Sequence, residues 1–113
     1  MIQVNELRIG SWVKHNGETI QVKPYHFEVF MNSESKPANA IPLTEEILLK
    51  CGYVKNGGWY DSVELKLDIF KDYKFFYIED VEDHTEIRKP IKHLHQLQNL
   101  YFALTGTELK IEL

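Results

Sequence analysis

The chain contains a single cysteine, Cys51, among its 113 residues, so no disulfide can form within it. A lone thiol is typical of proteins that work in a reducing compartment. The first residues carry neither the basic nor the apolar stretch of a secretory signal, and no apolar run approaches the roughly 18 residues that a membrane-spanning helix needs. We therefore expect a cytoplasmic protein without a membrane association.

Positive charge is also scarce, because 13 basic residues stand against 17 acidic ones and the formal net charge is −4. This balance argues against broad binding to a phosphate backbone, which requires a basic surface. Apolar residues make up 43% of the chain and charged residues 27%, as in ordinary globular proteins. We expect one folded domain that spans residues 1–113.

The short signatures of common enzymes are absent as well. The sequence has no phosphate-binding loop, dinucleotide fingerprint, nucleophile elbow or zinc-protease motif. No pair of carboxylates has a context that indicates general acid–base catalysis. These absences make an enzyme the less favoured interpretation without excluding one. The sequence thus predicts no catalytic residue, no cofactor and no metal site.

The clearest feature that is present is an N-terminal hairpin. Asn16 and Gly17 tolerate the positive φ angles of a two-residue turn, and a reversal there places Val13 opposite Ile20. Residues 25–31 are predicted to form a third strand. The strand–turn–strand pattern resembles the opening of a small SH3-like barrel.

A short central helix is predicted from residue 44 to residue 51. Thr44 suits the N-cap, and Leu43 can pack on Leu48 across the first turn. Gly52 suits the left-handed position that follows the last turn. These features agree on both ends of the helix.

Two antiparallel strands are predicted next. Residues 63–69 alternate apolar and charged side chains, which is typical of a half-buried strand, and residues 73–79 form its partner. A turn at residues 71–72 would pair Leu67 with Phe76.

The last strong element is an amphipathic helix that begins at about residues 90–93, extends to Leu104 and ends before Gly106. Its apolar face is expected to pack on the sheet through Leu94, Leu97, Tyr101 and Leu104. Together the elements predict an α+β fold: an antiparallel twisted sheet or a small SH3-like barrel, with a short central helix and a C-terminal amphipathic helix.

His95, Asn99 and Phe102 form a separate flank of the C-terminal helix, because residues three and four apart are neighbours on a helix surface. They are candidates for a ridge that binds a partner or ligand. The alternative is a hydrogen-bonded seam that holds the helix to a loop, since partly buried amides and imidazoles seek backbone partners. We favour the seam and keep the three residues as binding candidates.

An aromatic group is the second candidate site. Trp12, Phe75 and Tyr77, with Phe70 and Tyr73, could stack the bases of a single-stranded nucleic acid. Their acidic neighbours do not suit a phosphate backbone. Packing inside or over the sheet is the alternative.

Three polar groups are weaker candidates. His93 and His95 could share a metal ion if they lay on a strand, but not on a helix. The acidic segment 79–86 lacks the spacing of a calcium loop and is expected to be a solvated turn. Cys51 has no base signature near it and is expected to be buried.

Three stretches carry a family resemblance: NELRIGSWV at 5–13, IPLTEEILLKCGY at 41–53 and LHQLQNLYFALTGTEL at 94–109. Together they resemble small uncharacterised proteins of Bacteroidetes genomes, prophages and phages. The resemblance implies a bacterial or phage setting. It implies no reaction, because no activity is established for that group.

The function we expect from these features is that of a non-enzymatic interaction or accessory protein of a bacterium or its phage. A protein partner is expected, and a homodimer is compatible with the sequence. The alternative is a single-stranded nucleic-acid-binding module with an SH3-like N-terminal half. Nucleic acid is the less favoured partner, because the chain is acidic.

Overall fold

The computed structural model describes residues 2, 4–31, 38–61, 67–72, 75–80, 86–111 and 113. The elements are the 3-10 helix η1 (Val4–Glu6), β1 (Trp12–His15), β2 (Glu18–Gln21), α1 (Pro24–Met31), α2 (Glu45–Lys50), β3 (Val54–Asn56), β4 (Trp59–Asp61), β5 (Leu67–Asp72), β6 (Phe75–Asp80), β7 (Glu86–Ile91) and α3 (Leu94–Thr105).

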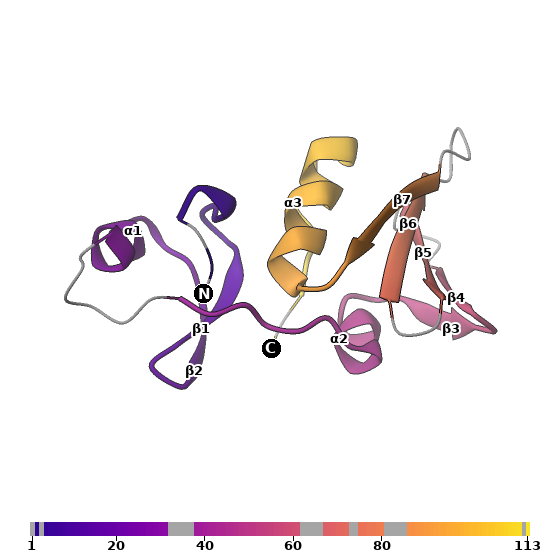
Figure 1. Cartoon of the computed structure of the whole chain (residues 1–113), viewed down its shortest axis with the longest axis horizontal. Coiled ribbons are helices and arrows are strands. Elements are labelled where there is room, and N and C mark those ends of the chain that lie inside the picture. Colours follow the sequence, from indigo (N-terminus) through magenta and orange to yellow (C-terminus); the bar gives the residue numbers. More distant parts are fainter. Residues whose placement is uncertain are drawn as a thin grey trace.

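These elements form two lobes of an elongated molecule that measures 45 × 26 × 24 Å (Figure 1). The N-terminal lobe holds η1, α1 and the β1–β2 hairpin. The C-terminal lobe holds an antiparallel sheet with the strand order β3-β4-β5-β6-β7. The α+β class is confirmed. The barrel alternative is wrong, because both sheets are open in the part of the chain that the structure describes.

The N-terminal hairpin follows the prediction. Val13 lies opposite Ile20, and the turn residues Asn16 and Gly17 take φ angles of 53° and 78°. Positive φ at both central positions matches the twist of the hairpin strands, which is why this residue pair favours the reversal.

The predicted third strand, residues 25–31, is wrong, because this segment forms α1. Pro24 takes the first helical position, where its fixed φ suits the helix and its missing N–H needs no partner. Phe27 and Phe30, three residues apart, then pack on the small N-terminal core. The aromatic content of the segment suggested a strand, whereas the spacing of these two rings matches a helix.

The ends of α2 are confirmed. Thr44 Oγ1 accepts a hydrogen bond from Ile47 N at 3.2 Å. At the other end Gly52 has a φ of +100° and donates to Leu49 O, while Tyr53 N donates to Leu48 O. This pair of bonds is the Schellman arrangement that a C′ glycine permits.

The predicted register of β5 and β6 is wrong. Leu67 pairs with Asp80 rather than with Phe76, because β5 continues to Asp72, which pairs with Phe75. Residues 71 and 72 therefore belong to β5 and do not form the predicted turn. The shift from 76 to 80 is an even number of residues, so the two faces of the sheet keep the predicted sets of side chains.

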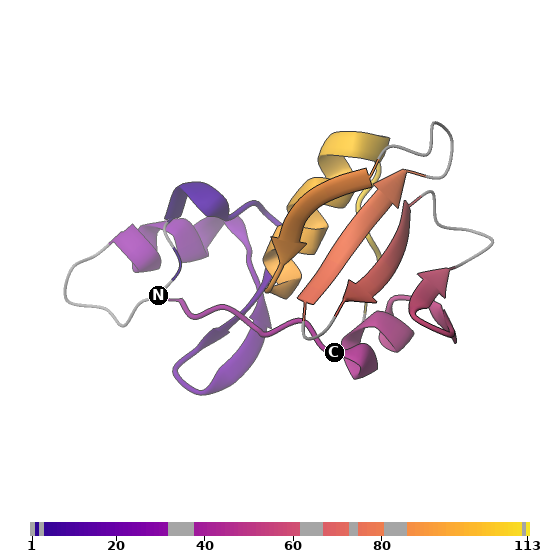
Figure 2. The same ribbon diagram turned by 45° about the vertical axis from the view of Figure 1, so that its right-hand side comes forward.

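The C-terminal helix α3 lies behind strands β5–β7 in Figure 2, and no described helix lies in front of them. Gly106, with a φ of +74°, ends it as predicted. Leu94, Leu97 and Tyr101 are buried in the main core, but Leu104 is 42% exposed, which corrects that part of the prediction. Leu104 lies in the last turn of the helix, beyond the part that the core covers.

The core beneath the sheet is built from its inner face and the two helices. Tyr60, Ile69 and Phe76 of β4, β5 and β6 join the buried leucines of α2 and α3 in one cluster. A second, smaller cluster fills the N-terminal lobe and contains Val13 and Val22. The part of the chain that the structure describes thus has two apolar cores.

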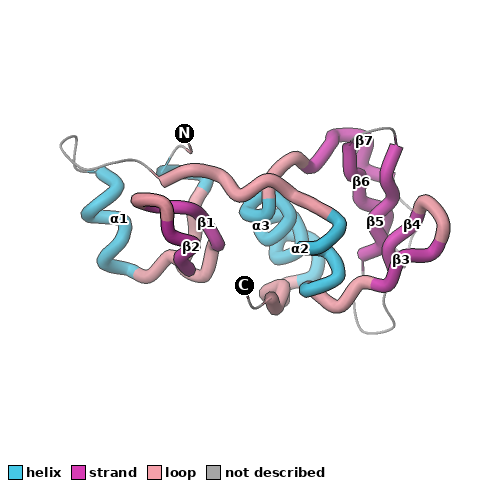
Figure 3. Tube along the Cα trace, turned by 90° about the horizontal axis from the view of Figure 1, so that it is seen from below, coloured by secondary structure: helices cyan, strands magenta, loops and turns pink. Residues whose placement is uncertain are grey.

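An extended segment, residues 38–43, joins the two lobes. Lys14 N donates to Asn39 O at 2.8 Å and Asn39 N donates to Lys14 O at 2.7 Å. Further along, Leu43 N donates to Lys92 O at 2.9 Å. Figure 3 shows α2 and α3 between the two sheets that this segment connects. None of the described helices has the length and apolar character needed to cross a bilayer.

Candidate functional site

The flank of α3 that the sequence marked as a candidate ridge faces the N-terminal lobe. Asn99 Nδ2 donates to Glu6 O at 2.7 Å, and Asn99 Oδ1 accepts from Arg8 Nε at 2.7 Å. The Arg8 guanidinium also donates to Gln98 O at 3.0 Å and contacts the carboxylate of Glu108. Asn99 therefore holds the helix to the N-terminal segment, as the structural alternative predicts.

Gln98 extends this seam into the interior. Its side chain is 2% exposed, its Oε1 accepts from Trp12 N at 2.8 Å, and its Nε2 donates to Gly10 O at 2.9 Å. A buried amide that satisfies two backbone groups of another element fixes the position of both. We refer to Arg8, Gln98, Asn99 and Glu108 as the inter-lobe seam.

His95 is also 2% exposed, and neither of its ring nitrogens makes a hydrogen bond to another residue that the structure describes. The nearest acidic oxygen, Glu6 Oε1, lies 3.9 Å from Nε2. Burial lowers the pKa of His95, and the opposing effect of Glu6 is smaller. The ring is accordingly a neutral, packed group at neutral pH.

Phe102 and Trp12 occupy the ends of this region. The Phe102 ring is 41% exposed and lies 4.6 Å from the Arg8 guanidinium carbon, which is cation–π geometry. Trp12 is half-buried and packs against the main core. In Figure 1 α3 lies between β1, the strand of Trp12, and β6, the strand of Tyr77, so these two strands do not form one continuous surface.

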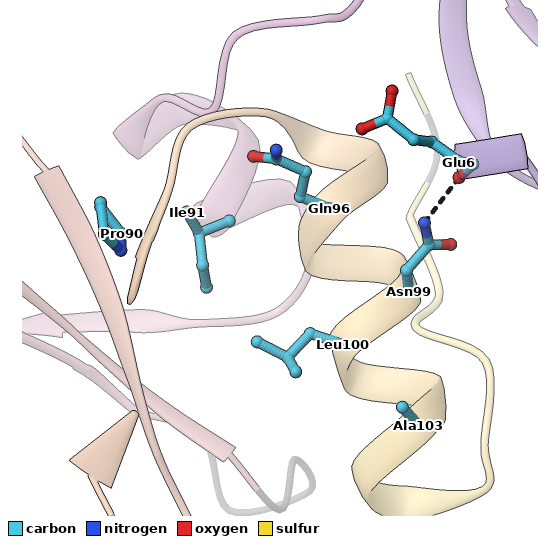
Figure 4. A pocket seen from close by; sticks show the side chains of 7 residues that line it. All are labelled: Glu6, Pro90, Ile91, Gln96, Asn99, Leu100 and Ala103. Atoms are coloured by element: carbon cyan, nitrogen blue, oxygen red, sulfur yellow. Dashed lines mark hydrogen bonds between the residues drawn. The ribbon is translucent and has the colours of Figure 1, made fainter. Parts of the chain in front are cut away.

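A cleft of about 430 Å³ lies between α3 and β7 (Figure 4). Its apolar lining comes from Pro90, Ile91, Leu100 and Ala103, and its polar lining from Glu6, Gln96 and Asn99.

The polar groups of this cleft serve the fold. Asn99 is bound to Glu6 O, and Gln96 Oε1 accepts from Lys92 N and His93 N. Of the described residues that line the cleft, Glu6 alone is a carboxylate, and none is a histidine or a cysteine. Such a lining offers no nucleophile and base of the kind that would indicate an enzyme.

The remaining polar candidates gain no support as reactive groups. Burial raises the pKa of the Cys51 thiol to about 12, so it stays protonated at neutral pH. Among the described residues, no three His, Cys, Asp or Glu side chains are close enough to hold a metal ion. Most of the acidic segment 79–86 lies outside the described residues.

The sheet surface opposite the core carries a ladder of aromatic rings. Trp59, Phe70 and Tyr77 come from β4, β5 and β6, and strand pairing places them side by side. The ring centroids of Trp59 and Phe70 are 5.2 Å apart, as are those of Phe70 and Tyr77, and the second pair is nearly parallel at 17°. Trp59 is 41% exposed and the other two rings are half-buried.

The ladder and its neighbours form what we call the aromatic face: Trp59, Phe70 and Tyr77 with Val54, Asp61 and Asp68. Strand alternation assigns the last three to this surface, and Val54 is exposed. Phe75 occupies a position on the same surface through its pairing with Asp72, although its side chain lies outside the described residues. Figure 2 views the sheet from this side.

The two lysines of β3 to β6 that the structure describes, Lys55 and Lys71, are directed to the other side. Lys55 Nζ lies 3.1 Å from Glu45 of α2, a contact that lowers the pKa of the Glu45 carboxyl. Lys71 Nζ lies 5.5 Å from the ring centroid of Phe76, on the core side. The outward positions of β3 to β6 therefore carry aromatic and acidic side chains, and strand alternation from Ile87, the partner of Ile78, gives Arg88 of β7 an outward position beside this face.

Trp59 and Arg8 are the important residues that the sequence interpretation missed. Trp59 follows the turn at Gly57 and Gly58, and alternation from that turn would have assigned it to the side opposite Tyr60. Arg8 had no local signal, because its partners lie about 90 residues further along the chain. Comparisons with protein-family models, curated proteins and solved structures found no match, so function is inferred from the geometry of the chain itself.

Proposed function

We propose that this chain is a non-enzymatic interaction protein that binds a protein partner through the aromatic face. The observation that carries the proposal is the ladder of Trp59, Phe70 and Tyr77 on a sheet surface that no described helix covers. Aromatic side chains are enriched at the centres of protein interfaces, where they bury large areas at low entropic cost.

The other candidate surfaces support binding less well. His95 and Asn99 are engaged in packing and in the inter-lobe seam, and the cleft beside β7 uses its polar groups within the fold. In the aromatic face, by contrast, the most exposed ring is a tryptophan, the residue most enriched at binding hot spots.

The setting we propose is the cytoplasm of a bacterium, or of a bacterium that carries a phage. The family resemblance of residues 5–13, 41–53 and 94–109 supports this setting. So does the single cysteine, which is buried.

The alternative function, binding of a single-stranded nucleic acid, draws its support from the same ladder, because stacked rings can hold successive bases. The carboxylates on the face oppose it, since such surfaces require basic neighbours to attract phosphates. A mobility-shift assay at low salt with a single-stranded oligonucleotide tests it. A salt-sensitive shift that Trp59→Ala abolishes would favour this alternative over a protein partner.

Affinity capture tests the main proposal with wild type, Trp59→Ala and Tyr25→Ala. Tyr25 of α1 is 61% exposed and is therefore a matched aromatic control on the other lobe. We expect wild type and Tyr25→Ala to retain the same partner and Trp59→Ala to lose it, with equal thermal stability for all three. Equal capture by all three proteins would contradict the proposal.

A further inference from the structure

The N-terminal end of α1 lacks the side chain that usually caps a helix. The residue before the helix, Lys23, occupies the N-cap position, and its ammonium can donate a hydrogen bond but cannot accept one. A positive charge at this end also opposes the helix dipole, and the first turn contains no acidic residue that would compensate it. The acceptor that a capped helix end requires therefore has to come from another group.

That group is the imidazole of His26, the third residue of α1. Its Nδ1 accepts a hydrogen bond from Lys23 N at 2.8 Å, and His26 N donates to Lys23 O at 2.9 Å. A side chain that reaches back from this helical position to the N–H of the N-cap residue is one half of a capping box, in which the position usually holds Glu or Gln. His26 thus supplies the acceptor that Lys23 lacks.

We propose that His26 is a proton-sensitive cap, which holds the first turn of α1 while its imidazole is neutral and releases that turn when the imidazole is protonated. A neutral imidazole accepts at Nδ1 when its proton is on Nε2, whereas both nitrogens of an imidazolium are donors. Protonation therefore removes the acceptor of Lys23 N and adds a positive charge at the positive end of the helix dipole. This device goes beyond the proposed function and does not depend on it.

The imidazole is held in place by aromatic packing as well as by its hydrogen bond. The ring of His26 is half-buried and stacks on that of Phe30, with the centroids 5.8 Å apart and the planes at 12°. The Tyr25 ring lies 4.2 Å away, and His15 of β1 contacts Phe30 from the other side of the lobe. His26 is therefore fixed in the orientation that directs Nδ1 to the helix end.

The surroundings of His26 keep the imidazole neutral at neutral pH. Burial lowers its pKa most, and His15 and Lys23 lower it further, so the pKa lies below the ordinary value of 6.5. The carboxylates of α1 and of η1, which packs against α1, are Glu28 and Glu6; the first is exposed, the second lies toward α3, and neither contributes to this pKa. The cap should accordingly be complete above pH 6.5 and be lost as the pH falls below that value.

Loss of one cap can loosen α1 because little else holds it. The helix has eight residues, none of its side chains is fully buried, and it lies at the end of the molecule away from the C-terminal lobe (Figure 1). Helices this short are unstable in water unless packing and caps support them. Release of the first turn reaches Phe27, which packs on the N-terminal core. We therefore expect acid to loosen α1 from its lobe while the rest of the chain stays folded.

NMR spectroscopy of the isotope-labelled full chain tests the proposal. The Cα chemical shifts of residues 24–27 report helix content, and the imidazole signals of His26 report its protonation. Between pH 7 and pH 5 we expect the helical shifts of wild type to decrease with the same midpoint as the His26 titration. The shifts of α2 are the internal control and should stay constant, because the Thr44 hydroxyl that caps α2 does not titrate in this range.

Two substitutions of His26 separate the cap from other effects of pH. His26→Gln keeps an acceptor at a position that suits Gln but does not titrate, so the helical shifts of residues 24–27 should stay at their neutral-pH level throughout. His26→Leu removes the acceptor and should show decreased shifts at both pH values. At pH 7 it should also reduce the hydrogen-exchange protection of the Lys23 amide several-fold relative to wild type.

Three results would overturn the proposal: wild-type shifts that stay constant while His26 titrates, a decrease that His26→Gln retains, or His26→Leu shifts equal to those of wild type at pH 7. An equal decrease in α1 and α2 would also contradict it, because the whole fold rather than one cap would then be lost. If His26→Leu fails to fold, the comparison of wild type with His26→Gln decides the question.

Discussion

Asn99 is the residue that ties α3 most directly to the N-terminal segment. Its amide bonds to Glu6 O and to Arg8 Nε, both at 2.7 Å. Replacement by Ala strands both partners, so Asn99→Ala should lower the free energy of unfolding by about 1–3 kcal/mol. Chemical denaturation measures the change, with Asn5→Ala on the exposed surface of η1 as the control. An unchanged or raised midpoint would assign Asn99 to a binding surface instead.

His95 is expected to make the stability of the folded protein depend on pH. Burial holds the folded-state pKa of His95 below its ordinary value of 6.5. As the pH falls through 6.5, the unfolded chain therefore binds a proton before the folded protein does, and the stability of the folded protein decreases. His95→Leu removes the titrating group and leaves no buried nitrogen unpaired.

We accordingly expect His95→Leu to be as stable as wild type or more stable at pH 7, and to lose less stability between pH 7 and pH 5. Denaturation midpoints across this range measure the effect. His26 also has a lowered pKa, so His26→Leu serves as the comparison for a half-buried histidine of the other lobe. A slope equal to that of wild type in His95→Leu would show that other groups control the pH dependence.

The sequence could predict that the Asn99 flank forms a seam, but not which groups it joins. An asparagine within a helix indicates a tertiary contact, because its helix propensity is lower than that of alanine. The partners Glu6 and Arg8 lie 93 and 91 residues away, where no periodicity or cap connects them. For the same reason no local sequence pattern indicated that Arg8 contacts α3.

At the scale of elements, the prediction succeeded where the determinants are local. The ends of α2 and the Asn16–Gly17 turn are set by residues within a few positions of one another. The register of β5 and β6 was missed because alternation is unchanged by an even shift, so only the position of the turn decides it. The identity of α1 was missed because the N-terminal core, a tertiary contact, decides between strand and helix.

Gly52 provides the test of a local determinant. Its φ of +100° is unfavourable for any residue with a Cβ, while an added methyl group would meet nothing within 4 Å. Gly52→Ala should therefore lower the free energy of unfolding by about 1–2 kcal/mol through the backbone alone. Gly58→Ala, at a turn position where φ is not positive, should cost less. Thermal or chemical denaturation of the two variants compares them, and equal losses would refute the assignment.

The whole molecule consists of two apolar cores joined by the inter-lobe seam and by residues 38–43. The N-terminal core is small, and none of the side chains of α1 is fully buried. A lobe of this size buries too little apolar surface to be stable alone, since small domains are marginal. Its stability therefore depends on contacts with the C-terminal lobe. Loss of a contact in the inter-lobe seam should accordingly destabilise the N-terminal lobe more than the C-terminal lobe.

Gln98 is the residue through which this coupling can be measured. Gln98→Ala leaves Trp12 N unpaired in a buried region and removes one partner of Gly10 O, so it should weaken the seam by about 1–3 kcal/mol.

Each lobe contains one tryptophan, Trp12 or Trp59. In Trp59→Phe the remaining Trp12 therefore reports the release of β1 from the main core, against which its ring packs, and in Trp12→Phe the remaining Trp59 reports the unfolding of the C-terminal lobe. With Gln98 present, the two fluorescence transitions should coincide, as one cooperative unit requires. With Gln98→Ala, the Trp12 transition should move to lower denaturant while the Trp59 transition moves less. Coincident transitions in both backgrounds would show that residues 38–43 and the remaining seam contacts couple the lobes without Gln98, and separate transitions with Gln98 present would show two domains rather than one.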